Sequence, residues 1–370
     1  MSSNQTVAVD PLKLASLVRS LFRQAGLNEE HAGLVAQNLC LAELRDVYSH
    51  GVSKVKPYIH SIENGTYNPY PVISVLRESG STLLLDGDFA PGAVSGTAAM
   101  ELCLNKAAES GFACAAVTRG RHFGMAAFYA MMALERGMIG IALCNSGKIM
   151  APYGGTSRVL GTNPICIAVP SGKDFPFVFD AATSEAAFNK IIVAGLEGRS
   201  IPTGWALDKE GRPTSDAKEA LEGMVIPFGG YKGSGLAIMV HVLSGLLGHA
   251  AAGAGLYDSV KDGNGDAGGV GFFFCALDVG RFQALGDFTR QVDDFIDEIK
   301  GARRQEPEQE IYVPGELEHI RRVKHLAHGV ELGLAVYGEL EETAFRLGVA
   351  FDITKDTREE TETYAGRTAI

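Results

Sequence analysis

The alternation of short apolar runs with amphipathic runs between residues 82 and 277 restricts the fold of this chain more than any other feature. Apolar runs with the length and the flanking turn residues of β-strands lie at 82–87, 112–118, 139–144, 177–180 and 270–277. Helical patterns lie between them, at 96–110, 125–136 and 233–247. Strands that alternate with helices predict a mixed α/β fold, and its long loops at 145–164 and 198–232 are candidates for function.

Both ends of the chain carry helical patterns. Asp10 before Pro11 is a typical helix start, and Asn28 begins a second helix that should end near Asp46. Further helices are predicted at 282–299, 317–328 and 331–348. The polar tail at 351–370 is rich in Thr and Glu, and we expect it to be poorly ordered.

The composition excludes some classes of partner. The 370 residues carry a formal net charge of −11, whereas nucleic-acid binding requires concentrated Lys and Arg. A small anionic substrate remains compatible, because one local cation is enough to bind a carboxylate. No basic and apolar leader opens the sequence, and the six cysteines form no CxxC pair. We therefore expect a cytoplasmic protein with reduced thiols and no metal site.

Two segments could be mistaken for functional signals. Residues 236–256 are apolar enough to cross a bilayer, but they include His241 and His249 and become rich in Ala and Gly, which favours a buried helix. Residues 263–268 match the GxGxxG pattern of dinucleotide-binding loops. Such a loop follows a strand and opens a helix, whereas here a strand comes after it, so we interpret the segment as a surface loop.

Two histidines in glycine-flanked motifs are candidates for proton transfer. His50 lies in YSHG at 48–51, just beyond an expected helix, and His122 lies in RHFG at 121–124, between a strand and a helix. Histidine titrates near neutral pH, and the end of a strand is a favoured place for ligand contact. The alternative for His50 is a histidine that stabilises a helix dipole, and for His122 it is a structural loop histidine.

Lys54 and Tyr58 stand four and eight residues after His50. If this segment is helical, the three side chains share one face. A lysine beside a catalytic histidine could hold a substrate carboxylate, whereas Lys54 taken alone is interpreted as a solvated lysine.

Two further motifs suit a phosphate-bearing ligand. Lys232 and Gly233 open an apolar helix, where backbone N–H groups and one ammonium can bind an anion. Asp180 ends a predicted strand and precedes small residues, which suits ribose hydroxyls and a flat ligand. A helix-capping aspartate is the alternative for Asp180.

In their order along the chain, these motifs resemble the malate/L-lactate dehydrogenase family, which is distinct from the Rossmann-type lactate and malate dehydrogenases. The matching motifs are SHG, RHFG, APYGG (151–155), GTNP, DAATS (180–184), IPTGWALDKEGRPTSD (201–216), GGYKGSGLA (229–237) and VPGE (313–316). The resemblance extends over residues 10–330, and this set in one order is highly specific. The family includes ureidoglycolate and sulfolactate dehydrogenases, diketogulonate reductase and piperideine-2-carboxylate reductase.

The resemblance implies a fold and an assembly. A mostly antiparallel sheet within residues 80–299 would bind the nicotinamide cofactor, NAD or NADP, without a Rossmann fold. Residues 1–79 together with 300–350 would form a helical domain on the substrate side. Family members are homodimers with active sites near the subunit interface, so a homodimer is expected here.

The resemblance also implies roles for individual residues. His50 would be the general acid/base, and His122 would be the second catalytic histidine. Substrate contacts would come from Ser49, Lys54 and Tyr58. Cofactor contacts would come from Ser146, Asp180, Ala181, Ala182, Thr183, Ser184, Lys232, Gly233, Gly315 and Glu316.

Two departures from the family pattern bear on the substrate. Arginine is usual where this chain has Lys54, and a proline or an acidic residue often stands where this chain has Gly147-Lys148. Lysine acts as a point charge, whereas arginine binds a carboxylate through two parallel hydrogen bonds, so the acid group of the substrate would be held differently.

We therefore predict an NAD(P)-dependent oxidoreductase that interconverts a 2-oxo acid and its 2-hydroxy acid. The cofactor would carry the hydride, and the protein would supply position and charge. Two alternatives remain open at this point, namely reduction of a cyclic imino acid and non-catalytic nucleotide binding on the same fold.

Overall fold

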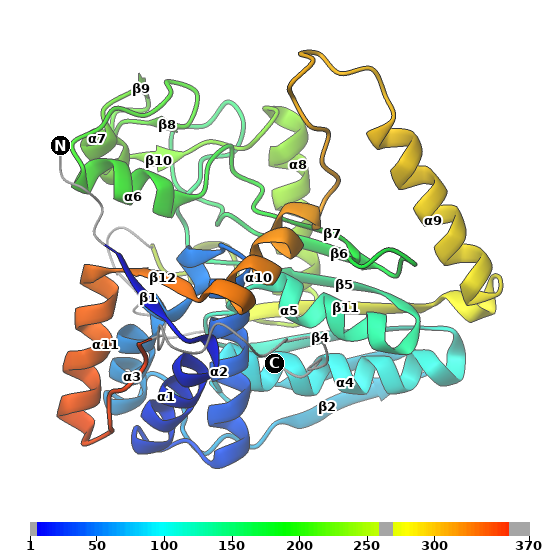
Figure 1. Cartoon of the computed structure of the whole chain (residues 1–370), viewed down its shortest axis with the longest axis horizontal. Coiled ribbons are helices and arrows are strands. Elements are labelled where there is room, and N and C mark those ends of the chain that lie inside the picture. Colours follow the sequence, from blue (N-terminus) through cyan, green and yellow to red (C-terminus); the bar gives the residue numbers. More distant parts are fainter. Residues whose placement is uncertain (1–5, 259–268, 355–370) are drawn as a thin grey trace.

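The computed structural model describes residues 6–258 and 269–354. The predicted surface loop at 263–268 lies outside the described residues, and so does the predicted tail beyond residue 354. Within the described part of the chain, strands and helices alternate, and the predicted mixed α/β fold is confirmed (Figure 1).

The first two helices begin where their caps predict. α1 (Pro11–Gln24) starts after Asp10, whose carboxylate accepts two backbone N–H groups of the first turn at 2.8 and 2.9 Å. α2 (Glu29–Leu44) starts after Asn28, whose side-chain oxygen accepts a backbone N–H at 2.8 Å. Each cap satisfies donors that have no partner inside the helix, which is why these two starts can be recognised locally.

Short turns then connect α2 to the next helix. The elements are η1 (Tyr48–His50), η2 (Val52–Lys54) and α3 (Val55–Glu63). They place the motif at 48–51 and the residues that follow it on successive turns of one compact segment. The expectation that His50, Lys54 and Tyr58 share one face assumed a single helix. The structure instead has two short 3-10 turns followed by an α-helix.

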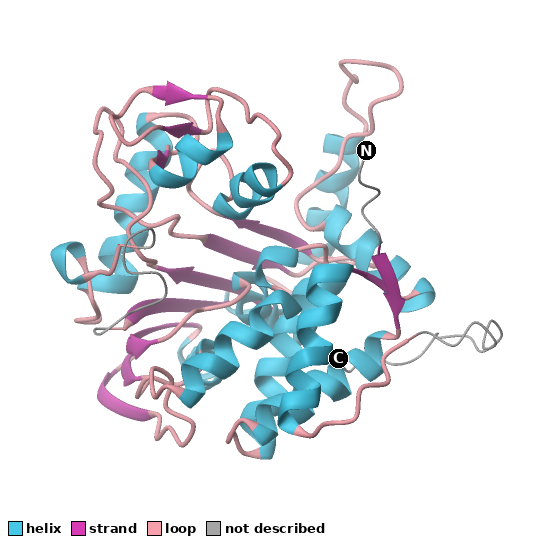
Figure 2. Cartoon of the chain, turned by 90° about the vertical axis from the view of Figure 1, so that its left-hand side faces the viewer, coloured by secondary structure: helices cyan, strands magenta, loops and turns pink. Residues whose placement is uncertain are grey.

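A seven-stranded sheet lies at the centre of the molecule, between a small β-containing unit and a cluster of helices (Figure 2). In spatial order its strands are β2 (Ser74–Ser79), β3 (Thr82–Asp86), β4 (Phe112–Gly120), β11 (Val270–Asp278), β5 (Met138–Cys144), β6 (Ile165–Val169) and β7 (Phe177–Ala181). β3 and β4 are parallel, and the other neighbouring pairs are antiparallel. The mostly antiparallel sheet that the resemblance implies is therefore confirmed.

Helices pack on both faces of this sheet. α4 (Gly92–Ser110) and α5 (Ala126–Ala130) cover one face, and α5 continues as the 3-10 turns of η3 (Met131–Arg136). α8 (Tyr231–Val240) continues as the π-helical turn η4 (His241–Leu246), which packs on β11 from the other face.

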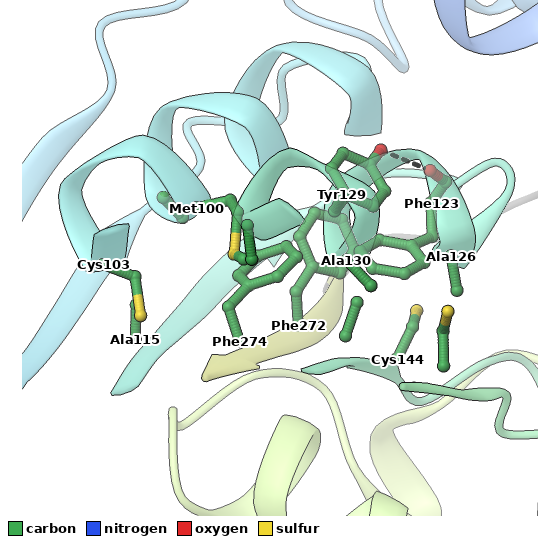
Figure 3. Packing of buried hydrophobic residues seen from close by; sticks show 14 of the residues in the cluster. Met100, Cys103, Ala115, Phe123, Ala126, Tyr129, Ala130, Cys144, Phe272 and Phe274 are labelled. Carbon is green, nitrogen blue, oxygen red and sulfur yellow. Dashed lines mark hydrogen bonds between the residues drawn. The ribbon is translucent and has the colours of Figure 1, made fainter. Parts of the chain in front are cut away.

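Aromatic side chains fill the core between the sheet and α5 (Figure 3). Phe272 and Phe274 of β11 form a cluster with Tyr129 and Phe123, in which the ring centroids of neighbouring pairs lie 4.5 to 6.3 Å apart. The Tyr129 hydroxyl donates to the carbonyl oxygen of Phe123 at 2.5 Å. Because Phe123 directly follows His122, this core fixes the loop that carries the second histidine.

The predicted loop at 198–232 folds with its neighbours into the small unit. Its elements are α6 (Phe188–Leu196), β8 (Ala206–Leu207), β9 (Pro213–Thr214), α7 (Ala217–Glu222) and β10 (Met224–Val225). A separate apolar core, which includes Ile191, Ala206 and Val225, holds the unit together.

The two ends of the chain meet in one helical cluster. β1 (Thr6–Val9) pairs antiparallel with β12 (Val330–Gly333), and α11 (Leu334–Leu347) packs against α1 and α3. α10 (Glu316–His328) contacts α2, whereas α9 (Leu285–Lys300) stands at the periphery (Figure 1). The proposed domain boundaries at residues 79 and 300 remain predictions.

The apolar segment at 236–256 is not one long helix. It contributes most of α8, the turn η4 and the short η5 (Gly253–Gly255). No helix in residues 6–258 and 269–354 combines the length and apolarity that a membrane crossing requires. The segment is only partly buried within this chain, since Leu236 and Met239 are 42% and 51% exposed.

Candidate active site

A cavity of about 660 Å³ opens where the turns after α2 approach the ends of β4, β5 and β7. Side chains from segments far apart in the sequence line it. Among them are these predicted site residues: Ser49, His50, Lys54, Tyr58, His122, Ser146, Asp180, Ala181, Ala182 and Gly315. The structure thus brings both histidines, all the predicted substrate contacts and half of the predicted cofactor contacts to one place.

His50 reaches the cavity from the end of η1. The Ser49 Oγ atom lies 2.8 Å from His50 Nδ1, which orients the imidazole and leaves Nε2 for a bound molecule. The turn is anchored to α2, because a carboxylate oxygen of Glu43 accepts the Val52 N–H at 2.8 Å. A Cβ atom at Gly51 would collide with this carboxylate, so the motif requires a glycine after the histidine.

His122 reaches the same cavity from the loop after β4. Its ring stacks on the ring of His50, with centroids 5.5 Å apart and planes 24° apart. His122 Nδ1 accepts the Gly124 N–H at 3.3 Å and is hydrogen-bonded to the Tyr58 hydroxyl. Because Nδ1 is an acceptor, the neutral ring carries its proton on Nε2. Gly124 has a φ of 75°, and a Cβ atom there would collide with Asn38 of α2.

The surroundings of the cavity favour neutral imidazoles. Burial, with a smaller contribution from the Lys54 ammonium, lowers the pKa of His50 to about 4. Burial and then the charges of His50 and Lys54 hold the pKa of His122 well below its usual value. Burial also lowers the pKa of Lys54, which has no acidic partner among the described residues. Two neutral histidines beside an unpaired ammonium suit the binding and deprotonation of a small anion.

Asp180 lies at another part of the cavity wall, near the end of β7. Its Oδ2 atom accepts the Ala127 N–H at 2.8 Å. Burial raises the pKa of Asp180 to about 6, against the opposing effects of that N–H and of Arg45. Ala181 and Ala182 follow and also line the cavity, and the side chain of each is a single methyl group. A carboxylate followed by small side chains can accept hydrogen bonds from hydroxyl or amide groups of a flat ligand.

The residues at this wall fit a nicotinamide cofactor. Gly315 has a φ of 90°, and a Cβ atom there would lie 2.9 Å from the backbone nitrogen of Val178, so the turn before α10 needs a glycine to approach β7. Asp180 offers an acceptor, and Ser146 offers a hydroxyl. The volume of the cavity lies within the usual range of small-molecule sites.

The remaining predicted cofactor contacts do not line the cavity. They are Thr183, Ser184, Lys232, Gly233 and Glu316. The hydroxyls of Thr183 and Ser184 donate to backbone carbonyls at 2.8 Å, and Glu316 is ion-paired with Lys300. Lys232 is exposed at the start of α8. A role of these five residues in cofactor binding stays a prediction.

Sequence reasoning did not single out Arg45 and Arg121, which are buried and line the cavity. A signal was present for both. Arg45 stands five residues before His50, near the expected end of the helix, and Arg121 belongs to the RHFG motif. Charged side chains next to candidate catalytic residues are natural candidates for the same site.

Comparisons with known proteins agree with this geometry. Residues 9–341 match the sequence family described as malate/L-lactate dehydrogenase. A malate dehydrogenase from Pyrococcus horikoshii is 38% identical over 91% of this chain and 94% of its own length. A Delta(1)-pyrroline-2-carboxylate reductase from Ancylobacter novellus is 32% identical over 88% of this chain and 94% of its own. The structure of sulfolactate dehydrogenase from Methanocaldococcus jannaschii superposes with a TM-score of 0.85 and 36% identity, covering 92% of this chain and 98% of that one.

Proposed function

This chain belongs to the malate/L-lactate dehydrogenase family, and from that premise we propose that it interconverts a 2-oxo acid and its 2-hydroxy acid with NAD or NADP. The chain is an enzyme of the 2-hydroxy acid dehydrogenase class, as its named relatives indicate. The observation that carries the proposed chemistry is the stacked, neutral pair of His50 and His122 beside the unpaired Lys54.

His50 is the proposed general acid/base. The nicotinamide cofactor supplies or accepts the hydride at the substrate carbon. In oxidation, His50 Nε2 takes the proton of the substrate hydroxyl as the hydride leaves the same carbon. In reduction, protonated His50 returns that proton to the carbonyl oxygen. Ser49 holds the opposite ring nitrogen, so Nε2 stays directed at the substrate.

Lys54 is proposed to bind the substrate carboxylate, with Tyr58 beside it. The ammonium is half-buried and lacks an acidic partner within the described residues, so a carboxylate would supply the missing charge. The bound carboxylate would also offset the Lys54 charge, which lowers the pKa of His50. Substrate binding would therefore make it easier for His50 to hold the proton that reduction requires.

The cofactor is proposed to lie along the wall made by β7 and the turn before α10. Contacts are proposed from Ser146, the segment 180–184, Lys232, Gly233, Gly315 and Glu316. The family contains proteins named for imino acids as well as for hydroxy acids, and this supports cyclic imino acid reduction as a second candidate reaction. An imine that arrives already protonated needs less help from a general acid, so His50 would matter less in that reaction.

A substrate panel with both cofactors tests the proposal. The absorbance of NADH and of NADPH would be followed as pyruvate, oxaloacetate, sulfopyruvate, oxalurate, diketogulonate and piperideine-2-carboxylate are added in turn. We expect one of the 2-oxo acids to be reduced, because the cavity offers one proton donor and one carboxylate-binding cation. If only the cyclic imino acid is reduced, the result would support imine reduction and contradict reduction of a 2-oxo acid. Cofactor binding without any turnover would contradict both reactions.

We further propose that the protein is a cytoplasmic homodimer. Part of α8 and its continuation is apolar and exposed in the single chain, including Leu236, Met239, Leu246 and Leu247. An apolar helix face of this kind is typical of a surface that a second subunit covers. The same segment leads directly from Lys232 and Gly233, so a dimer contact here would bear on the proposed cofactor site.

A further inference from the structure

Arg45 is a buried guanidinium whose side chain has no hydrogen-bond or ion-pair partner among the described residues. It caps the C-terminal end of α2, is 4% exposed and lines the cavity. Its buried Nε atom has no hydrogen-bond acceptor, and no ion pair joins its side chain to any residue in the described ranges. A buried cation without hydrogen bonds is strongly unfavourable, and burial accordingly lowers the pKa of Arg45. Such a residue suggests that the partner arrives with a ligand.

The charges around Arg45 separate it from the part of the cavity where the acid substrate is proposed to bind. Lys54 lowers the pKa of both catalytic histidines, whereas Arg45 has no such effect on either. Arg45 instead influences the pKa of Asp180, and Asp180 with Glu318 favours the charged form of Arg45. Arg45 therefore belongs to the cofactor wall, not to the carboxylate site.

The balance of charge at this wall selects the chemistry of the ligand. Asp180 and Glu318 both line the cavity near Arg45, so the guanidinium already faces two carboxylates, while Arg322 acts on it as a second cation from outside the cavity. A pyrophosphate would add further negative charge beside two carboxylates, which is unfavourable. A primary carboxamide is neutral and offers one acceptor oxygen and two N–H donors, which match a guanidinium and a carboxylate.

We infer that Arg45 donates a hydrogen bond to the carboxamide oxygen of the cofactor's nicotinamide group and that Asp180 accepts one from the carboxamide N–H. This assignment rests on the proposed function, because it presumes a nicotinamide cofactor. The Asp180 Oδ2 atom is held by the Ala127 N–H at 2.8 Å, which leaves the other carboxylate oxygen for the ligand. The pair would fix the rotation of the ring about its glycosidic bond, and hence which face of the ring is turned toward the substrate carbon near His50.

Calorimetric titration with two ligands tests the inference without any turnover. The first ligand is the reduced dinucleotide, NADH or NADPH, that the wild type binds more tightly, and the second is ADP-ribose, which keeps the pyrophosphate but lacks the nicotinamide. Arg45→Met should weaken binding of the dinucleotide by roughly 10- to 100-fold, since a hydrogen bond to a charged group is lost. Binding of ADP-ribose should stay within about twofold.

Two further variants keep the test decisive. Arg322→Met removes a neighbouring guanidinium of α10 that does not line the cavity, and it should leave both affinities unchanged. Thermal unfolding will show whether Arg45→Met folds. If it does not, Arg45→Lys replaces it in the test, because lysine keeps a positive charge between Asp180 and Glu318. It should still weaken dinucleotide binding several-fold, because an ammonium cannot present the planar fork of a guanidinium.

The 3-acetylpyridine analogue of the dinucleotide, which keeps the oxygen and lacks the amide N–H, tests the part of Asp180. The wild type should bind this analogue less tightly than the parent dinucleotide, and Asp180→Ala should abolish that preference.

Parallel losses of affinity for the dinucleotide and for ADP-ribose in Arg45→Met would mean that the guanidinium binds phosphate. Unchanged affinities in this variant would mean that the guanidinium only balances charge. Either result would overturn the inference, whereas a wild type that binds neither dinucleotide would overturn the proposed function itself.

Discussion

His50 and His122 share one wall of the cavity but are held by different means. Ser49, the residue before it, orients His50, whereas Tyr58 of α3 and the Gly124 N–H orient His122. Both histidines could be selected from the sequence, because each stands in a short motif with glycine. Their stacking could not, because it depends on how the loop after β4 approaches the turns after α2. Arg45 was missed for the same reason, since its burial in the cavity wall is a tertiary property.

At this scale the pH dependence of oxidation is a direct prediction. The acid limb of kcat/KM for a hydroxy acid reports the pKa of the base in the free enzyme, and for His50 this pKa is lowered to about 4, well below 6.5. Lys54→Met removes one of the two causes of the lowered pKa, so the limb should move to higher pH while burial keeps it below 6.5. Steady-state rates measured from about pH 3 to pH 9 locate the acid limb in both proteins.

Lys56 provides the control for that experiment. It lies two residues further along, is exposed and forms an ion pair with Glu342 at 2.7 Å. The acid limb of kcat/KM should lie at the same pH in Lys56→Met as in the wild type. A wild-type limb at the ordinary histidine value, with no movement in Lys54→Met, would mean that His50 is not the base that the profile reports.

The elements around the site show which features sequence reasoning can predict. α1 and α2 were predicted from their caps, and most strands of the sheet from apolar runs. The pairing of β1 with β12 was not predicted, because its partners are more than 320 residues apart in sequence and each strand is short. The 3-10 form of η1 and η2 was not predicted, because their shape is set by Glu43 across the turn and not by local propensity.

Glu43 gives a prediction about this turn. Burial raises its pKa from 4.5 to about 7 despite the hydrogen bond from Val52, so the folded state holds the proton more tightly than the unfolded state. The free energy of unfolding therefore loses a contribution of up to about 3 kcal/mol as the pH rises through this interval. Glu43→Gln cannot ionise, so its stability relative to the wild type should increase between pH 5 and pH 8, as urea unfolding would measure.

The same residue separates stability from positioning. Glutamine can still accept the Val52 N–H, so Glu43→Gln should keep kcat close to the wild-type value. Glu43→Ala removes the acceptor and leaves space beneath Gly51, so the turn that carries His50 should shift and kcat should fall by about tenfold or more. Equal kcat values in the two variants, or a stability of Glu43→Gln that followed the wild type at every pH, would contradict this role of Glu43.

For the whole molecule, the site forms where three parts of the chain meet. The turns after α2 supply His50 and Lys54, the sheet with the loop after β4 supplies Asp180 and His122, and the segment before α10 supplies Gly315. The resemblance to the family predicted this arrangement better than local sequence patterns did. The strand order of the sheet depends on pairing between strands that are distant in sequence, which local patterns do not reveal. The apolar surface of α8 is one of the exposed apolar surfaces of the single chain.

The proposed dimer makes that surface testable. Met239 is 51% exposed on α8, and Met239→Glu would place a charge within the proposed interface. We expect light scattering to show a dimer for the wild type and a shift toward monomer for this variant at micromolar concentration. Phe345→Glu on α11 replaces a more exposed apolar residue, 88% exposed, away from α8 and should remain dimeric. A monomeric wild type, or dissociation by both variants alike, would refute this interface.

The most direct test of the proposed chemistry compares His50→Ala with His60→Ala in reduction of the preferred 2-oxo acid. His60 is an exposed histidine on α3, ten residues further along, and serves as the matched control. We predict that His50→Ala lowers kcat by at least about 100-fold, since a positioned general acid contributes roughly 10²- to 10⁴-fold, while the affinity for the reduced cofactor stays near the wild-type value. His60→Ala should match the wild type in both quantities. Unchanged kcat in His50→Ala would contradict the assignment of His50 as the proton donor and, with it, the central claim about this site.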